Sequence, residues 1–400
     1  MRRSKYKGLL IAISMASLEC YNPTFINILP QVYKFLLYFL SFAFFFLTLR
    51  NKSVASKNLI YSIAAVSVCQ LISAYNAYEF NGQPLGVSVI ATMQGFAYLL
   101  LIPLTKSKLA IKDIEQIVEF FAICFLVCSV LNHLSSAPLF GSADEGVDRG
   151  ATRFRLLGIY WAIFFFLMKI NRYAIEGSKK DLYWIMATGL GILFSLTRQD
   201  IVVSFILGGM LYFIRTKLVK KLLFASLAAS LIFFLLPHVK VVNSLIETSM
   251  EEKAAQSQYD NIRIVAADYY TFEYPRNVQQ VIFGVGVPSF GNSSYGNVFQ
   301  RTQELLKVYR EDVGYCGFYY NYGIIATSLL VILFVWMLFL KLPDRYVYLK
   351  YYAGAFLLLN IASAPCQNNV SIIPFMLGLY LTVKVRYESA CKKEKNKFLI

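Results

Sequence analysis

Residues 313–340 read VGYCGFYYNYGIIATSLLVILFVWMLFL and contain no charged side chain. An apolar stretch of about 20 residues crosses the hydrocarbon core of a bilayer as a helix. In lipid, every backbone N–H and C=O has to be paired within the segment, so a run of this kind is helical. Strands of a membrane barrel would be shorter and would alternate in polarity. The stretch therefore predicts a transmembrane helix.

Comparable apolar runs recur along the whole chain, separated by short charged stretches. The 400 residues are 57% hydrophobic, and the mean hydropathy of +0.53 is too high for an ordinary soluble globule. We expect an all-α, polytopic integral membrane protein with about twelve transmembrane helices. The predicted spans are residues 8–22, 31–49, 58–76, 86–104, 114–132, 154–170, 182–197, 201–214, 222–237, 313–340, 351–366 and 371–386.

The basic residues lie mostly on one predicted side of the membrane. That side holds the N-terminal segment with Arg2 and Arg3 and the lysine-rich tail 392–397, whereas loops 21–30 and 77–85 on the other side hold no Lys or Arg. Cytoplasmic loops carry an excess of Lys and Arg, so both termini are predicted to be cytoplasmic. Topology explains the net charge of +16 without a nucleic-acid partner.

The predicted organisation has three parts. They are residues 1–237 with the helices up to that point, a large outer loop at 238–312, and residues 313–400 with the last helices and a basic tail. Long connections are usually functional or disordered. Amphipathic spacing predicts short helices in this loop, which would cap the membrane domain, at 242–255, 262–272 and 299–309.

The connection Ser195–Asp200 places Arg198 and Asp200 between two apolar runs with almost no loop. Charge near a bilayer edge is costly unless it is paired or useful. One interpretation is a tight turn in which Arg198 pairs with Asp200. The other is an anion site for a phosphate-bearing lipid, since a guanidinium can bind phosphate oxygens through two parallel hydrogen bonds.

Glu311 and Asp312 lead directly into the helix that opens with Gly314 and Gly317. These two glycines fall on one helix face and allow close packing against a neighbour. The acids either stabilise the helix N-terminus or supply a catalytic base.

Gly284-Val-Gly286, further upstream, predicts a turn. Because neither a helix nor a dinucleotide pattern follows, a nucleotide site is not expected.

The order of these features resembles the superfamily of bacterial O-antigen polymerases and O-antigen ligases. The matching features are Thr197-Arg198 after a mid-chain span, a large outer loop with Arg263 and Gly284-x-Gly286, the entry Glu311-Asp312-x-Gly314-x-x-Gly317, and Tyr322-Gly323 after it. Ligases of this superfamily carry a histidine in the large loop. The only histidines here are His133 and His238, and none lies between 239 and 400. The resemblance therefore favours the polymerase branch.

The resemblance implies a membrane glycosyltransferase at the periplasmic face of the bacterial inner membrane. It would polymerise undecaprenyl-diphosphate-linked oligosaccharide repeat units into O-antigen, capsular polysaccharide or exopolysaccharide, with a chain-length regulator and a flippase as further partners. Preorganised cations would stabilise the leaving diphosphate, and a carboxylate would take the proton of the acceptor hydroxyl. The candidate cations are Arg198, Arg263, Arg276 and Arg153, and the candidate bases are Glu311 and Asp312. We expect no metal and no cofactor.

Other classes remain as alternatives: a ligase, a lipid-linked oligosaccharide flippase or other transporter, and a non-catalytic assembly partner. Transporters usually carry charged groups near the membrane midplane and contain an internal repeat. In this chain the candidate charges gather at the predicted outer face.

Overall fold

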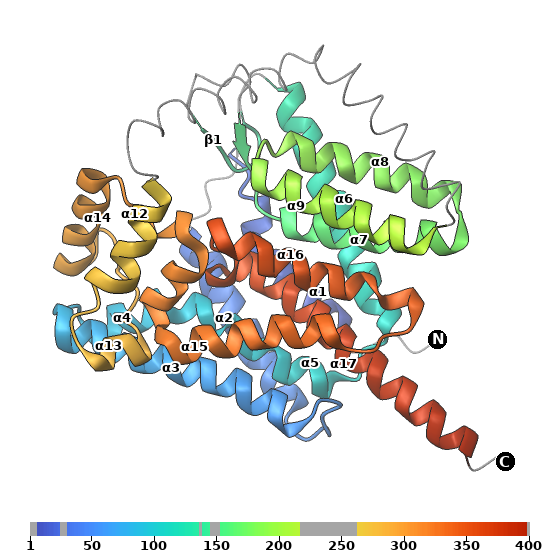
Figure 1. Ribbon diagram of the computed structural model, residues 1–400, viewed down its shortest axis with the longest axis horizontal. Helices are drawn as coiled ribbons and strands as arrows, with labels where there is room; N and C mark the ends of the chain where they lie inside the picture. Colours follow the sequence, from blue (N-terminus) through green and yellow to red (C-terminus); the bar gives the residue numbers. More distant parts are fainter. Residues whose placement is uncertain (1–5, 25–29, 136–137, 145–152, 217–261, 398–400) are drawn as a thin grey trace. The chain divides into compact units, whose positions relative to one another are not determined.

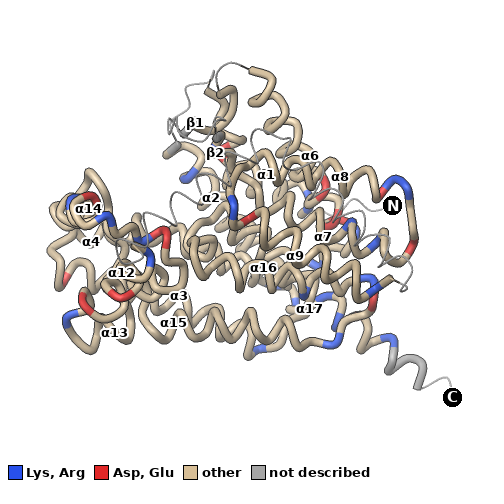
Figure 2. Tube along the Cα trace, turned by 45° about the horizontal axis from the view of Figure 1, so that its top comes forward, with Lys and Arg blue, Asp and Glu red and all other residues tan. Residues whose placement is uncertain are grey.

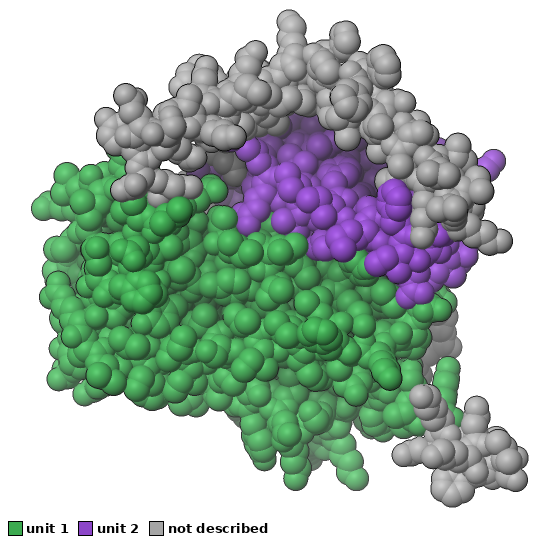
Figure 3. All heavy atoms as spheres, viewed as in Figure 1, with its two compact units in different colours: residues 1–20, 28–120, 262–400 green, residues 21–27, 121–261 purple. Residues whose placement is uncertain are grey.

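The computed structural model describes residues 6–24, 30–135, 138–144, 153–216 and 262–397 (Figure 1). They are mostly helical and separate into two compact units (Figure 3). Unit 1 comprises Met1–Cys20, Ile28–Phe120 and Ile262–Ile400; unit 2 comprises Tyr21–Asn27 and Phe121–Asn261. The predicted span 222–237 and the predicted loop helix 242–255 lie outside the described residues.

Six helical stretches in the described ranges are long and apolar enough to cross a membrane, judged by length and composition. They are Gln31–Thr48, Lys57–Asn81, Leu85–Ser107, Ile111–Leu134, Arg310–Phe339 and Asn369–Lys392. Each coincides with a predicted span. The described chain is thus mostly helical, as predicted, and contains helices of the kind that cross membranes.

The other predicted spans that fall in described residues also form helices, but these are shorter or carry more charged residues. They are α1 (Lys7–Ser17), α7 (Ile159–Glu176), α8 (Lys179–Phe194), α9 (Arg198–Arg215) and α16 (Tyr348–Ala362). The total of twelve spans stays a prediction.

Helix α2 (Pro30–Thr48) presents a row of exposed phenylalanines. Phe35, Phe39, Phe42 and Phe46 are 76%, 69%, 64% and 52% exposed, and they follow one another at intervals of three or four residues. Such spacing places them on one face of the helix. An apolar face of this kind is unfavourable in water and typical of a helix that contacts lipid.

Unit 1 is built around α3 (Lys57–Asn81), α15 (Gly314–Phe339) and α16, with α15 packed against both of the others. Leu85–Ser107 consists of α4 (Leu85–Thr92), a 3₁₀ stretch (Met93–Leu100) and α5 (Leu101–Ser107). The unit also contains α17 (Asn369–Lys397), which carries Lys384, Arg386 and Lys392 in its second half, whereas α15 is uncharged along its length (Figure 2).

Unit 2 holds the end of α6 (Ile111–Leu134), then α7, α8 and α9. Strands β1 (Ser142–Asp144) and β2 (Arg153–Arg155) form an antiparallel ribbon in which Ala143 pairs with Phe154. This ribbon is a small departure from the predicted all-helical chain. A buried ion pair between Lys169 Nζ and Asp181 Oδ1, 3.2 Å long, joins α7 to α8.

The described part of the large loop forms short helices near the places predicted. They are α12 (Ile262–Asp268), a π-helical turn (Tyr269–Glu273), α13 (Val278–Phe283) and α14 (Ser294–Leu306). Two of them begin with side-chain caps: Asn277 accepts from the Gln280 N–H, and Ser293 accepts from the Gly296 N–H.

Helix α15 is interrupted, although the sequence predicted one continuous span. A 3₁₀ turn (Arg310–Val313) precedes it, and Gly323 inside it has φ 77° and ψ 178°. That backbone conformation is essentially restricted to glycine. The break divides α15 into a short N-terminal part and a longer apolar part.

Candidate functional site

The loop helices pack onto the N-terminal part of α15 through an aromatic cluster. Its buried members come from α3, from the loop helices and the segments that connect them, from the 3₁₀ turn and from α15: Ala77, Ala266, Tyr270, Val285, Tyr295, Phe299, Val308, Val313 and Tyr320. Large aromatic side chains contribute much buried area, so this part of the loop is fixed to unit 1 by a core of its own.

Hydroxyl groups inside the aromatic cluster are satisfied by hydrogen bonds. The Tyr270 hydroxyl donates to the Val308 carbonyl at 2.8 Å and accepts from Gln303 Nε2 at 3.3 Å. Tyr295 and Tyr320 share a hydrogen bond of 2.6 Å between their hydroxyls. Burial raises the pKa of Tyr270 and of Tyr274, so both phenols stay protonated near neutral pH.

Gly284–Gly286 lies against the break in α15. The Val285 N–H donates to the Tyr320 carbonyl at 2.8 Å, and the Gly286 N–H donates to the Asn321 carbonyl at 3.2 Å. A Cβ on Gly284 would lie 2.2 Å from the Asn321 carbonyl oxygen. The Gly-x-Gly pattern, predicted as a turn, therefore lets two backbones approach, and its N–H groups pair two carbonyls at the helix break.

Polar side chains of α3 and the turn after it hold the same glycine segment. Asn76 Nδ2 donates to the Gly284 carbonyl at 2.7 Å. Gln83 Nε2 donates to the Val287 carbonyl at 3.0 Å, and Gln83 Oε1 accepts from the Ser289 N–H at 2.9 Å. Both amide side chains are fully buried, so they fix the loop in one register.

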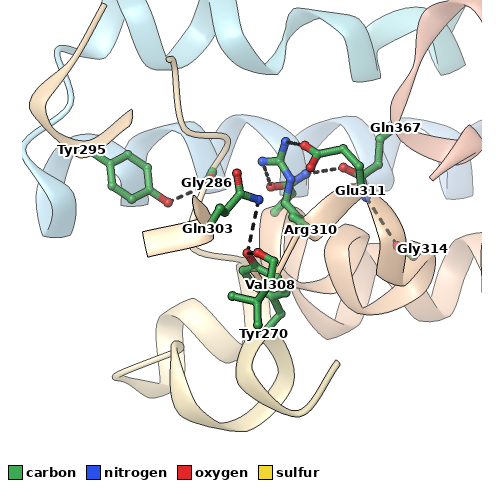
Figure 4. Close-up of polar contacts among 10 residues, drawn as sticks. Tyr270, Gly286, Tyr295, Gln303, Val308, Arg310, Glu311, Gly314 and Gln367 are labelled. Atoms are coloured by element: carbon green, nitrogen blue, oxygen red, sulfur yellow. Dashed lines mark hydrogen bonds and ion pairs between the residues drawn. The ribbon is translucent and has the colours of Figure 1, made fainter. Parts of the chain in front are cut away.

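Arg310 lies immediately before the acidic pair and is buried, with 8% of its side chain exposed. Its Nη2 lies 2.6 Å from Glu311 Oε1, and its Nη1 donates to Asn321 Oδ1 at 3.0 Å (Figure 4). The guanidinium carbon also lies 5.7 Å from the centre of the Phe299 ring, within the range of a cation–π contact. Arg310 thus ties the acidic pair to the helix break and to the aromatic cluster.

The hydrogen-bond chain continues from Arg310 toward the end of α16. Asn321 Nδ2 donates to Gln367 Oε1 at 2.8 Å, and Gln367 Nε2 donates to the Gly314 carbonyl at 3.4 Å. A Cβ on Gly314 would lie 1.8 Å from the Asn360 carbonyl oxygen, and one on Gly317 would lie 2.4 Å from the Arg310 carbonyl oxygen. Both glycines are therefore positions of close backbone approach.

The two candidate bases have different surroundings. Glu311 is ion-paired with Arg310, and 52% of its side chain is exposed. Asp312 is also exposed, and its backbone N–H donates to the Tyr309 carbonyl at 3.1 Å. Glu311 is thus bound to a buried cation, and Asp312, the next residue, is exposed to solvent.

The candidate cations are distributed over both units. Arg263 in α12 and Arg276 before α13 are exposed residues of unit 1, and the Arg276 guanidinium lies 6.0 Å from the centre of the Tyr274 ring. Arg198 begins α9 in unit 2, where it is half-buried, and Asp200 in the same turn is 6% exposed. Arg153 lies in β2, opposite Asp144; its side chain lies outside the described part.

Arg310, Asn321, Asn76 and Gln83 were not singled out from the sequence. A signal existed, because polar and ionisable residues within apolar spans are expensive and often mark functional positions. Asn76 and Asn321 lie inside predicted spans. Which of them meet in space depends on contacts more than 200 residues apart along the chain, and the sequence does not specify these.

Within the residues that the structure describes, no group of three or more His, Cys, Asp or Glu could hold a metal ion. Comparison of the chain with models of protein families and with curated proteins found no match.

Proposed function

We propose that this protein is a membrane glycosyltransferase that polymerises undecaprenyl-diphosphate-linked oligosaccharide repeat units into a surface polysaccharide. It acts at the outer face of the bacterial cytoplasmic membrane. The observation that supports this proposal most is the arrangement of Asp312, Glu311 and Arg310 at the entrance to α15, with the arginine buried and the aspartate exposed.

In the proposed reaction, a sugar hydroxyl of one lipid-linked unit attacks the anomeric carbon of the growing chain on another lipid. A glycosidic C–O bond forms, and the bond from the anomeric carbon to the diphosphate breaks. Asp312 takes the hydroxyl proton, and the lipid diphosphate leaves with the bonding electrons. General bases of this kind contribute about 10²- to 10⁴-fold in rate.

Glu311 is a positioning residue in this proposal. Its carboxylate neutralises Arg310, which would otherwise be a buried and uncompensated charge. Arg310 in turn holds Asn321 beside the helix break. This arrangement fixes the turn Arg310–Val313 that carries Asp312.

Arg263 and Arg276 are the proposed diphosphate ligands of unit 1. Arg263 is exposed on α12, and Arg276 is exposed in the turn between the π-helical stretch and α13. Guanidinium groups suit the role because they remain charged and match pairs of phosphate oxygens. Arg198 is the corresponding candidate in unit 2.

A transporter or flippase is the second candidate, and the broken helix α15 favours it. Discontinuous helices form the substrate sites of many transporters, where unwound carbonyls coordinate the ligand. In this chain, however, the Tyr320 and Asn321 carbonyls at the break accept hydrogen bonds from Val285 and Gly286. They are already engaged by the protein itself, which supports the glycosyltransferase over the transporter.

The test is the glycan profile of a deletion strain, with surface glycan separated as a gel ladder and lipid-linked intermediates analysed alongside. Loss of a polymerase should leave single repeat units that still reach the final acceptor. Long polymer retained on the lipid diphosphate would indicate a ligase and would overturn the proposal. An outer face without product, with lipid-linked units stranded inside, would indicate a flippase instead.

A further inference from the structure

Unit 2 contains a pocket that none of the proposed catalytic residues lines. Its volume is about 180 Å³, and it lies among α6, β2, the start of α7 and the turn between α8 and α9. Its residues are Phe125, Ser129, Asn132, His133, Phe154, Arg155, Leu156, Leu157, Ile159, Phe194, Ser195 and Thr197. A cavity of about 150 Å³ can hold one benzene molecule, so this pocket has room for one six-membered ring.

Aromatic side chains form one wall of the pocket. The His133 and Phe194 rings are stacked, with centroids 4.5 Å apart and an interplanar angle of 30°. Phe154 meets His133 edge to face at 5.2 Å. Flat apolar faces next to polar groups suit a sugar ring, which has apolar C–H faces and polar edges.

His133 also supplies a hydrogen-bonding edge. Its Nδ1 lies 2.9 Å from the Ser129 carbonyl oxygen, and a carbonyl only accepts, so Nδ1 carries the proton. In the neutral ring Nε2 is then an acceptor, able to receive a hydroxyl hydrogen. Ser195 and Thr197 also line the pocket, and their hydroxyls donate to the Ile192 and Ser195 carbonyls.

The charged lining of the pocket is positive. Arg155 is exposed and lines it. The pocket is also lined by Ile159, the first residue of α7, and by Thr197, the N-cap residue of α9. Neither helix has a side-chain cap, and helix N-termini favour negative charge. Asp200, in the first turn of α9, is buried and does not line the pocket.

We propose that this pocket binds one sugar ring that bears an acidic group, with the ring against His133 and Phe194 and the acid at Arg155. This acidic sugar is part of the lipid-linked repeat unit, and that assignment rests on the proposed function. The pocket thereby selects acidic oligosaccharides as substrates.

The test measures binding to the purified full-length protein in nanodiscs by isothermal titration calorimetry. The probes are methyl β-D-glucuronide, the neutral methyl β-D-glucoside and inorganic phosphate. The glucuronide should bind about two- to fivefold more tightly than the glucoside, because Arg155 is exposed and an ion pair at an exposed site is worth up to about 1 kcal/mol. Phosphate, which lacks the ring, should bind more weakly than the glucuronide.

Arg155→Gln should remove the preference for the glucuronide, whereas Arg301→Gln, a change of an exposed arginine on α14, should leave it intact. His133→Phe keeps an aromatic wall but removes the acceptor, so it should weaken both sugars. Phe194→Leu, at a partly exposed position, provides a second change to the wall if His133→Phe does not fold.

Equal affinity for glucuronide and glucoside, or equal affinity for glucuronide and phosphate, would overturn the proposal. So would an unchanged preference in Arg155→Gln. Binding of these probes does not require polymer synthesis, so its failure is distinguishable from failure of the proposed function, which the deletion strain tests.

Discussion

Glu311 and Asp312 are neighbours in sequence but differ in what their carboxylates contact. Glu311 pairs with the buried Arg310 at 2.6 Å, whereas Asp312 is exposed beside it. The sequence predicted an acidic pair at a helix start and left open whether it acts as a cap or as a base. The sequence alone does not distinguish these two possibilities, because it does not show that Arg310 is buried and paired with Glu311.

The adjacent amide substitutions form a matched pair of tests. Asp312→Asn should lower polymer formation by about 10²- to 10⁴-fold through loss of the base. Glu311→Gln should lower the stability by about 1–2 kcal/mol, less than a fully buried pair would lose, because Glu311 is half exposed. Polymer ladders and thermal unfolding in detergent measure the two effects. Full polymer from Asp312→Asn would remove this residue from the proposed mechanism.

Arg263 and Arg276, the candidate diphosphate ligands in the large loop, allow a test of guanidinium geometry. Arg263→Lys and Arg276→Lys retain the charge but lose the planar pair of donors, so each should lose most of the activity at normal protein level. Arg301→Lys on α14, outside the proposed site, is the control and should keep full activity. Polymer at the wild-type level from both loop variants would show that these arginines are surface residues that do not bind the diphosphate.

Helix α15 shows what an apolar run can and cannot predict. Its length and composition predicted the helix, and the prediction is confirmed. The break at Gly323 was missed because its cause is not local: the segment that fills it, Gly284–Gly286, lies about forty residues earlier in the chain and is held by Asn76 of α3.

Gly323→Ala should destabilise unit 1 by about 2 kcal/mol or more, because alanine is strained at φ 77°. Its Cβ would also lie 2.2 Å from the Ile282 carbonyl oxygen. Gly209→Ala in α9 is the matched control, since nothing lies within 4 Å of its added Cβ. That change should be neutral or stabilising by up to about 1 kcal/mol. Equal melting temperatures for both variants would contradict the constrained break.

At the scale of the whole molecule, the predicted orientation can be tested by thiol labelling of single-cysteine variants in a cysteine-free background. Ser294 on α14 and Lys180 on α8 are both exposed. In whole cells, a membrane-impermeant reagent should label Ser294→Cys and not Lys180→Cys. The reverse result would place the candidate site on the cytoplasmic side of the membrane and would contradict the proposed function.

The helices of the described residues were largely predictable, because apolar length is a property of the sequence itself. The pocket in unit 2 was not predictable, although the turn that contains Arg198 was a candidate anion site and lies beside the pocket. Its wall combines His133, Phe154 and Phe194, which come from three separate elements. The distance between such residues is set by the packing of the elements and not by any local pattern.

Reconstitution of the purified protein in liposomes that contain lipid-linked repeat units tests the proposed function most directly. The prediction is a ladder of lipid-linked oligomers, with one undecaprenyl diphosphate released for each glycosidic bond formed, and no ladder from the Asp312→Asn protein. Transfer of lipid-linked units across the bilayer without any new glycosidic bond would contradict it.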